Sequence, residues 1–345
     1  MHIFSLIMAL MAFLPSSAYA QDSTHVITVK DITPKESFLK KLEGTFIAAP
    51  HYSSEMGLGV AMQYVFSKPF AIIGNVTTEG YVLAGFTGNS TTRKKKWRFN
   101  YKGYFNYAPS YFWGFGYEAA ENRNNKSKYD TQKFLLQFDA AYYVTPHFSF
   151  GPAAGYEWIR WKNFNDGNPS TQTLNYGLFA TLDTRDAAAN PTEGIYAHFR
   201  QRNYTNLSGS TSLQLDCYTK VWEGGILASD IYTIFTYGNF AEQMLPTIGG
   251  TERMRGYYYG RYRNNNIISA QIELRQTIWQ MISGVVWVGG ANLWGEYNKF
   301  QWKYTLPSYG LGARVAITDN LKLRLDYGFG KGGQNCFILS LNEAF

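Results

Sequence analysis

The chain has 345 residues, of which 17% are charged and 17% aromatic, and 27 of them are tyrosines. Beyond residue 20 no run of about 18 apolar residues occurs, which excludes a helical membrane protein. The mean hydropathy of −0.27 is ordinary for a soluble chain, and a secreted soluble β-sandwich is one interpretation. A transmembrane β-barrel gives the same average, because alternate residues face a polar lumen, and its interfacial girdles better explain the aromatic content.

Residues 1–20 have the pattern of a secretory signal peptide. An apolar core from Ile3 to Leu14 is followed by Ala18, Tyr19 and Ala20, a small-x-small cleavage site. The apolar run is too short to span a membrane. We therefore expect the mature chain to begin at residue 21.

Residues 21–44 form a short segment with one local signal. Thr33, Pro34 and Glu36 make a capping box with proline at the first helical position, and Gly44 is a suitable helix end. These signals predict a helix of about two turns in a periplasmic segment that precedes a barrel over residues 45–345.

From Gly57 onward, runs of about ten residues alternate between apolar and polar side chains and are separated by turn residues, as in transmembrane barrels. In one run Leu321, Leu323 and Leu325 would face lipid while the charged residues between them face the lumen. We predict sixteen strands, an even number that leaves both termini in the periplasm. Their ranges are 55–66, 69–77, 80–88, 96–106, 110–119, 130–144, 147–161, 172–184, 193–205, 211–223, 226–239, 264–278, 281–293, 304–317, 320–330 and 335–345.

Connection lengths supply an independent prediction of sidedness, because periplasmic turns of such barrels are short and outer loops long. The predicted turns lie at 108–109, 146, 223–225, 279–280 and 318–319, and the predicted outer loops at 93–95, 121–128, 163–170, 241–263 and 296–302. A short first outer loop near Ser67 and a long periplasmic link at 186–193 depart from the rule. A further split at 78–79 is needed to reach sixteen strands.

Arg93, Lys94, Lys95 and Lys96 concentrate positive charge in one of these outer loops. A nucleic-acid patch is one interpretation, and a solvated loop is another. Behind a signal peptide, attraction to anionic lipid head groups is more plausible than nucleic-acid binding. We therefore expect no nucleic-acid partner.

The two cysteines are predicted to be unpaired. Cys217 alternates in phase with lipid-facing residues, whereas Cys336 is in phase with lumen-facing ones, so that the two thiols should point in opposite directions. A disulfide would need their Cα atoms within about 7 Å of each other.

The segment around residues 248–257 resembles the sixth-loop motif of the bacterial surface-antigen superfamily, the barrels that include BamA, TamA and the two-partner secretion transporters. The matching residues are Gly249, Gly250, Arg255, Gly256 and Tyr257. Further similarities are Asp183-Thr184-Arg185-Asp186 followed by Pro191 and Gly194, Ile272-Glu273-Leu274-Arg275, and the terminal Phe345. The resemblance implies a loop that folds into the lumen and a last strand whose aromatic end, Phe345, is the assembly signal.

By the same resemblance, Arg255 should bond acidic residues of the inner wall, and a guanidinium in a confined polar lumen is best satisfied by a carboxylate. The family usually carries an aspartate on the thirteenth strand, where this chain has Gly289. We therefore name Glu273 and Asp326 as candidate partners of Arg255.

Members of this family that insert or secrete proteins carry periplasmic POTRA modules, and residues 21–44 are too few for one. We therefore expect a member without POTRA domains, located in the outer membrane of a Gram-negative bacterium, that is an accessory to outer-membrane biogenesis or transport. Its expected partners are outer-membrane lipids and lipopolysaccharide, the outer-membrane assembly machinery, and a periplasmic protein or a second copy of the chain.

The alternative is a passive porin for small anionic solutes. The inward cations Arg200, Arg202, Arg275, Lys322 and Arg324 would then line an open pore. In the competing interpretation, which we favour, the acids Asp183, Asp216, Glu273 and Asp326 neutralise these cations inside a plugged lumen.

No sequence motif points to catalysis. A nucleophile elbow, a zinc-binding helix, paired Cys-x-x-Cys and a phosphate loop are all missing from the sequence. The histidines of the mature chain are His25, His51, His147 and His198, and His198 is predicted to be a hydrogen-bonded lumen residue. We expect neither enzymatic activity nor a metal or other cofactor.

Overall fold

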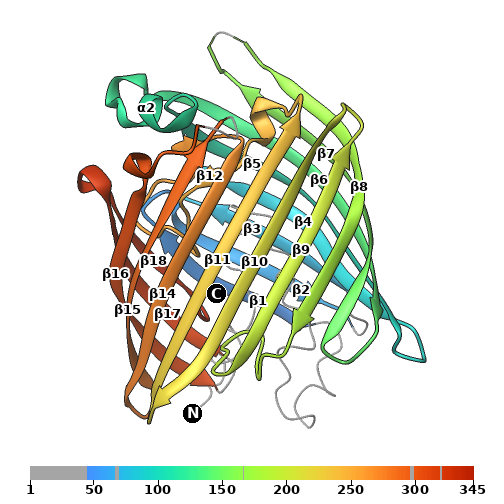
Figure 1. The fold of residues 1–345 in the computed structure, drawn as a ribbon, viewed down its shortest axis with the longest axis vertical. Helices are drawn as coiled ribbons and strands as arrows, with labels where there is room; N and C mark the ends of the chain where they lie inside the picture. The colour runs from blue at the N-terminus through green and yellow to red at the C-terminus, as the bar shows by residue number, and fades with distance from the viewer. Residues whose placement is uncertain (1–44, 67–69, 166, 296–298, 319–320) are drawn as a thin grey trace.

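A computed structural model describes residues 45–345 except 67–69, 166, 296–298 and 319–320. These residues form a closed antiparallel barrel of sixteen strands (Figure 1). The barrel strands are β1 (Thr45–Ser53), β2 (Gly57–Val65), β3 (Phe70–Thr77), β4 (Val82–Thr91), β5 (Trp97–Phe112), β6 (Ser127–Tyr143), β7 (Phe148–Lys162), β8 (Ser170–Asp183), β9 (Gly194–Tyr204), β10 (Ser208–Trp222), β11 (Gly225–Gly238), β14 (Asn266–Trp279), β15 (Ile282–Trp294), β16 (Leu306–Thr318), β17 (Leu321–Gly330) and β18 (Asn335–Leu341). The predicted signal peptide and helix lie outside the described residues.

Residues 239–265, which we call loop 6, connect β11 to β14. This loop contains a small hairpin of β12 (Thr247–Ile248) and β13 (Tyr262–Arg263). The remaining elements are helix α2 (Gly116–Glu121) and the single turns η2 (Arg123–Asn125), η3 (Glu242–Met244), η5 (Trp302–Tyr304) and η6 (Lys331–Gly333). Within the described ranges, no helix is both long and apolar enough to cross a membrane.

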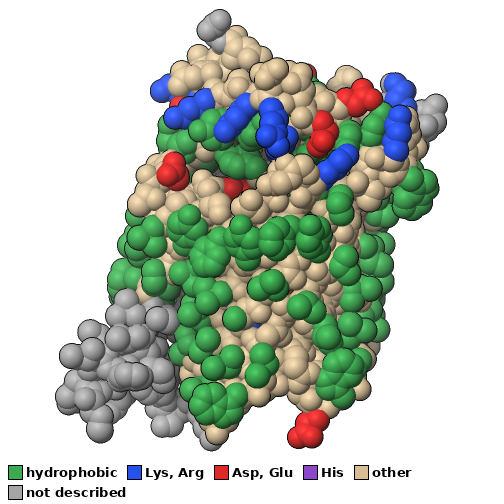
Figure 2. Space-filling view, turned by 90° about the vertical axis from the view of Figure 1, so that its left-hand side faces the viewer, with side chains coloured by type: hydrophobic (Ala, Val, Ile, Leu, Met, Phe, Trp, Pro, Cys, Tyr) green, Lys and Arg blue, Asp and Glu red, His purple; other side chains and the backbone are tan. Residues whose placement is uncertain are grey.

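Side chains alternate between the two faces of the wall, as the sequence predicts. An exception is Leu321, which was predicted to face lipid but is buried with Ala49 and Leu341, next to a register shift between β16 and β17. Leu178 and Val288 are each 61% exposed on the outside, whereas Arg314 and Asp326 are buried inside. In Figure 2 hydrophobic side chains cover the barrel wall, and Lys and Arg side chains gather above them. This arrangement fits a wall in contact with lipid around a polar interior.

The predicted number of strands is confirmed, but two of the predicted strands were wrong. β1 was missed; it pairs with β2 over nine residue pairs, around the turn that precedes Gly57. Residues 96–106 and 110–119 were predicted as separate strands around a turn at Pro109, whereas β5 runs through Pro109, which pairs with Asp130. β4 starts only opposite Tyr107, so at Pro109 the strand β5 pairs with β6 alone. Proline is tolerated at such an edge.

The missed strand reverses the predicted sides of the first connections. We call the end of the barrel that carries loop 6 the loop end, and the opposite end the turn end. The turn at 78–79 exists but lies at the loop end, whereas the basic residues 93–96 fall in a connection at the turn end. The predicted outer loop near Ser67 lies outside the described residues. From β6 onward the predicted sides agree with the structure, including the long link at 184–193.

The last strand is shorter than predicted. β18 ends at Leu341, and Asn342 adopts a left-handed conformation with φ of 59°, which turns residues 343–345 into the lumen. Figure 1 places the C-terminus inside the outline of the barrel. The prediction of an alternating strand that extends to Phe345 is therefore wrong.

This shortening leaves the barrel closed by a weak seam. β1 and β18 share only the pairs Tyr52 with Leu339 and Ser53 with Ile338. Beyond them the Ser54 N–H donates to the Phe337 carbonyl at 3.2 Å. Backbone groups alternate in direction along a strand, so Pro50 occupies a position whose N–H would face β18. Proline has no backbone N–H, so it cannot donate a hydrogen bond to β18.

The cysteines are as predicted. Both are free, Cys336 is buried, and Cys217 is half-buried on the outward-facing side of β10.

We predict that backbone amides along the β1–β18 seam exchange hydrogen faster than those between β10 and β11, because local opening is easiest where few ladder bonds must break. The β10–β11 ladder extends from Ser208 paired with Gly238 to Trp222 paired with Gly225. Hydrogen–deuterium exchange on the micelle-embedded protein measures both. Equal protection of the two ladders would contradict a weak seam.

Candidate functional site: loop 6 and the C-terminal tail in the lumen

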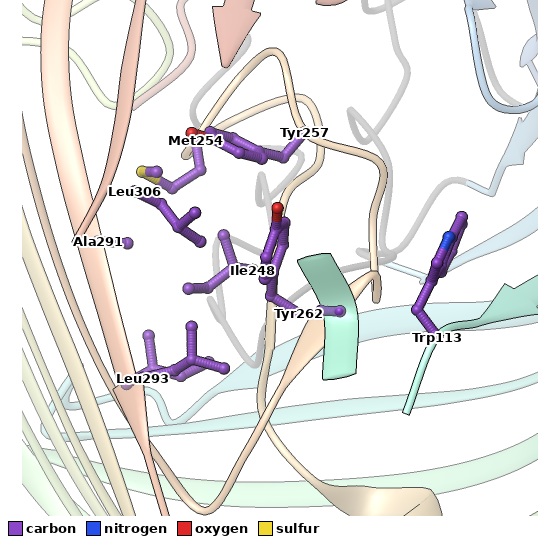
Figure 3. Packing of buried hydrophobic residues seen from close by; sticks show 10 residues of the cluster. Trp113, Ile248, Met254, Tyr257, Tyr262, Ala291, Leu293 and Leu306 are labelled. Carbon is purple, nitrogen blue, oxygen red and sulfur yellow. The ribbon is translucent and has the colours of Figure 1, made fainter. Parts of the chain in front are cut away.

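Loop 6 folds back into the barrel, as the family resemblance implied. Its residues Ile248, Tyr257 and Tyr262 are buried against the inner wall, where they meet Leu293 and Leu306. Figure 3 shows these side chains gathered between the loop and the strands, with Trp113 on the far side. Burial of apolar side chains therefore fixes the loop at the loop end of the lumen.

Arg255 contacts both candidate partners at once. One terminal nitrogen lies 2.6 Å from Glu273 Oε2 on β14, and the other lies 2.9 Å from Asp326 Oδ2 on β17. The guanidinium also stacks on the Trp287 ring, 3.7 Å from its centroid. Arg255, Glu273 and Asp326 are all buried, so the planar fork of arginine joins two strands to the loop in a way that a lysine could not.

These contacts belong to a closed ring of six alternating charges, which we call the charge ring. From Arg255 the ring passes through Glu273 to Arg275, with Arg275 Nε 2.7 Å from Glu273 Oε1. Glu343 then joins Arg275 at 3.6 Å to Arg314 at 2.7 Å. Arg314 returns to Arg255 through Asp326, at 2.6 Å. Each buried charge thus has an opposite charge on two sides, the condition under which buried ion pairs are tolerated.

Glycines let the loop lie directly on the wall. A Cβ added to Gly328 on β17 would stand 2.3 Å from the Arg255 carbonyl oxygen. Gly256 has φ of +119°, a conformation that side chains disfavour. Tyr257 follows, and its hydroxyl donates to the Pro307 carbonyl at 2.5 Å and accepts from the Lys331 N–H. In the Gly-Tyr part of the motif, the glycine therefore lets the loop backbone approach β17, and the tyrosine anchors the loop to the wall.

The other motif glycines, Gly249 and Gly250, also have positive φ, of 107° and 119°. At Gly289, where the family usually has an aspartate, a Cβ would stand 2.6 Å from the Ala270 carbonyl. Asp326 and Glu273 provide the acids for Arg255 without it. Arg255 therefore has two acid partners without an aspartate at position 289, although among the described residues its Nε is buried without a hydrogen bond.

Comparisons with known proteins agree with this geometry. Residues 70–337 match the Omp85 superfamily domain. The chain belongs to the Omp85 superfamily. No curated protein matches it.

Solved structures share the fold of this Omp85 barrel. BamA from Haemophilus ducreyi lacking POTRA domains 1–3 is 12% identical with a TM-score of 0.64, over 87% of this chain and 70% of that one. CdiB from Acinetobacter baumannii is 11% identical with a TM-score of 0.58, over 86% of this chain and 59% of that one. CdiB from Escherichia coli is 11% identical with a TM-score of 0.60, over 87% of this chain and 63% of that one. At these identities the likeness concerns the fold alone.

The C-terminal tail of the Omp85 barrel, residues 342–345, is part of the same site. Glu343 binds Lys322 at 2.9 Å in addition to Arg275 and Arg314. Phe345 packs on Tyr218, and its carbonyl accepts from Arg275 Nη2 at 3.0 Å. Sequence reasoning placed Phe345 on the wall because the alternating pattern continues to the end. It missed the role of Glu343, whose partners lie on three strands.

A second arginine of loop 6 was also missed. Arg253 binds Asp230 on β11 at 2.6 Å and lies over the Tyr232 ring. It precedes Arg255 by two residues, so the Arg-x-Arg pattern was the available signal. Two arginines thus attach the loop to two parts of the wall.

The remaining predicted lumen charges are neutralised only in part by the acids named from the sequence. Arg324 lies 3.7 Å from Asp326. Arg200 pairs instead with Asp139 at 2.8 Å, and Asp183 with Arg185 at 2.9 Å. Asp216 hydrogen-bonds to the Gln214 amide. A pattern of inward charges predicts that pairing occurs, but partners across the lumen depend on the barrel's curvature.

The three histidines within the described residues act as hydrogen-bonding groups, and His25 lies outside them. His198 Nδ1 lies 2.8 Å from the Thr181 hydroxyl, and its Nε2 accepts from Arg200. His51 bonds Asn75, and His147 bonds the Asp183 carbonyl. Among the residues that the structure covers, no cluster of three or more His, Cys, Asp or Glu side chains could hold a metal ion.

Glu55 connects the seam to loop 6. It lies in the turn between β1 and β2, next to Ser54, and its Oε1 accepts from the Tyr259 N–H of loop 6 at 2.7 Å. Burial raises the pKa of Glu55 to about 7. The carboxyl group that accepts this hydrogen bond from loop 6 therefore titrates near neutral pH.

We predict that Arg255→Ala loosens loop 6, because Glu273 and Asp326 each lose a partner, at a cost of up to about 3 to 5 kcal/mol for buried charges. Limited proteolysis of the folded barrel should cut loop 6 faster. Arg261→Ala is the matched control: Arg261 lies in the same loop but is half-buried and donates to the Ala120 carbonyl. Equal cleavage of the two variants would contradict a structural role of the ring.

We predict that acidification from above pH 7 towards pH 4.5 stabilises loop 6. The folded-state pKa of Glu55 is above its ordinary value of 4.5, so the folded protein takes up a proton in this window and the unfolded protein does not. Glu55→Gln mimics the protonated acid and should remove this part of the pH dependence. Protease protection of loop 6, measured at several pH values for both proteins, tests this; identical pH profiles would contradict it.

Proposed function

We propose that this Omp85 barrel resides in the outer membrane of a Gram-negative bacterium and is an accessory to outer-membrane biogenesis or transport, with clients that engage the seam between β1 and β18. The observation that carries the proposal is the seam itself, with two residue pairs where the other neighbouring strands of the barrel share seven or more. An edge with unpaired backbone groups is a template for another strand.

The tail supports the same proposal. Continuing the register of Tyr52 with Leu339 would set residues 342–345 opposite residues 46–49 of β1. The tail therefore has the length needed to extend the seam, yet it lies in the lumen on the charge ring. With the tail held there, the β1 edge is left available to a client segment.

A passive anion porin is not favoured. Loop 6 occupies one side of the lumen through the charge ring and a buried apolar cluster. Most of the cations that an open pore would display are bound to acids. Single-channel recordings in planar bilayers should therefore give small or intermittent currents, whereas large, steady, anion-selective channels would support the porin.

The expected partners follow from the position in the membrane. Loop-end cations such as Arg123 and Lys126 are exposed, and Figure 2 shows Lys and Arg side chains above the apolar wall. Phosphate groups of lipopolysaccharide are the matching lipid chemistry. The assembly machinery, a periplasmic protein and a second copy of the chain stay predictions, as do the absence of enzymatic activity and the assembly role of Phe345.

A disulfide across the seam tests the proposal. Ser53→Cys with Ile338→Cys, in a chain whose native cysteines are serine, should lock β1 to β18. Leu213→Cys with Thr233→Cys locks β10 to β11 as the matched control. A deletion strain of the parent bacterium is complemented with each, and the abundance of outer-membrane proteins and surface lipids is compared.

We expect the wild type and the control to restore the outer membrane, and the oxidised seam variant to fail until it is reduced. Full complementation by the oxidised seam variant would show that no client passes between β1 and β18. An outer membrane unchanged by the deletion would count against any role in biogenesis or transport.

A further inference from the structure

The lumen contains a cavity on the side that loop 6 leaves free. Its volume is about 590 Å³; β5 to β9 form one side of its wall, and loop 6 and residues 341–345 form much of the other. The lining extends from Trp161 near the loop end to Tyr143 and Ser149 near the turn end. Cavities of this size accommodate small organic ligands.

Positive charge exceeds negative charge on this wall. Arg98 and Lys102 of β5, Lys133 of β6 and Arg200 of β9 all line the cavity. Two acids neutralise two of them, because Arg200 binds Asp139 at 2.8 Å and Lys133 lies 3.8 Å from Glu157. The nearby Asp183 is bound by Arg185. Of these four cations, Arg98 and Lys102 on β5 are left as the surplus. Arg202 of β9 lines the same wall, and the acids Glu55, Glu79, Glu252 and Glu343 lie on the other sides of the cavity.

The two surplus cations lack partners of their own. Within the described part of the chain, Arg98 Nε and Nη2 are buried without a hydrogen bond. Lys102 lies within electrostatic reach of Asp139 and Glu157, but both of these acids are bound to other cations. Arg98 as a whole is half-buried, but guanidinium nitrogens that are buried without a hydrogen bond are costly, so a bound anion would lower the free energy of this wall.

Their spacing indicates the kind of anion. Arg98 and Lys102 are four residues apart on the same face of β5, so their Cα atoms are about 13 Å apart. Long side chains can converge from that distance on two anionic groups of one small molecule. Arginine binds phosphate and carboxylate in bidentate geometry, and lysine binds them as a point charge.

The rest of the lining suits a hydroxylated organic body. Asn100 lies between the two cations, and Asn106, Thr131 and Thr181 add hydrogen-bonding groups, while Tyr104 and Phe179 add aromatic surface. The wall around the cavity is continuous, since β5 pairs with β6 over its whole length. An acyl chain could not pass through such a wall, so the ligand is a water-soluble molecule.

Further positive charge lies at the turn end, next to Arg98. Arg98 is the second residue of β5, and the connection that precedes it carries Arg93, Lys94, Lys95 and Lys96, all exposed. Clustered charge at the mouth of a cavity raises the local concentration of oppositely charged ligands. The basic run therefore lies where it would attract anions towards Arg98.

We propose that the lumen is a binding site for a soluble organic anion that carries two phosphate or carboxylate groups, held between Arg98 and Lys102. The site holds a ligand rather than conducting ions, because two apolar clusters lie at the loop end, one around Tyr262 and Leu306 and the other around Phe112 and Trp161. The inference does not depend on any opening of the seam.

Isothermal titration of the full-length barrel in micelles with fructose 1,6-bisphosphate tests the site. We expect saturable binding by the wild type and affinities lowered about tenfold or more by Arg98→Gln or Lys102→Gln, since each removes charged hydrogen bonds. Lys128→Gln is the matched control, because Lys128 is exposed at the start of β6. Heat-modifiability on gels confirms that each variant is folded.

Three outcomes would overturn the proposal. They are no binding by the wild type, unchanged binding by the folded Arg98→Gln/Lys102→Gln double variant, and an equal loss in Lys128→Gln, which would indicate non-specific attraction. A second arm repeats the titration in nanodiscs with and without lipopolysaccharide. Competition by lipopolysaccharide would show that the site binds a lipid phosphate and not a soluble anion. Unchanged binding would support the soluble ligand.

Discussion

The ion pairs between Arg255 and the two acids Glu273 and Asp326 are the interaction on which the arrangement of the lumen depends. A single buried ion pair rarely stabilises a protein, because desolvation of the two charges offsets their attraction. In the charge ring each acid faces two or more cations, and the stacking of Arg255 on Trp287 adds a further favourable contact. The network is therefore satisfied only when loop 6, three wall strands and the C-terminal tail are all in place.

One consequence is that loop 6 and the seam are connected. Glu343 completes the ring and so keeps residues 342–345 away from β1. At the loop end Glu55 connects the β1–β2 turn to Tyr259. Both edges of the seam thus contact the loop or its network. A change in loop 6 would alter the balance between a tail in the lumen and a tail on the wall.

A second consequence is an asymmetric lumen. The side formed by β14 to β18 is filled by loop 6 and by charges that neutralise one another, whereas β5 to β9 line the open cavity with Arg98 and Lys102 in surplus. The sixteen-stranded wall has room for both. Acids neutralise the cations of the charge ring on one side, but only part of the cations on the other side. A ligand site therefore explains the remaining cations better than a porin does.

Local patterns in the sequence were sufficient for the barrel fold and for the direction of side chains on most strands, whereas the entry of loop 6 into the lumen and the acid partners of Arg255 were implied by the resemblance of its motif to a known family. These features rest on alternation, on turn residues and on a motif contiguous in the chain. The strand count was right because two errors cancelled: β1 was missed, and β5 was split at Pro109. Proline indicates a turn from sequence, yet it is accepted in a strand where a neighbour ends.

Tertiary structure alone decided the direction of the tail, the pairs Arg200 with Asp139 and Arg253 with Asp230, and the side of the barrel on which residues 93–96 lie. Continued alternation predicts a strand to Phe345, because the pattern does not record that Arg275, Arg314 and Lys322 converge where Glu343 can reach them. Such convergence depends on the curvature of a closed wall. It brings together residues that are far apart in the chain, and no local pattern contains that information.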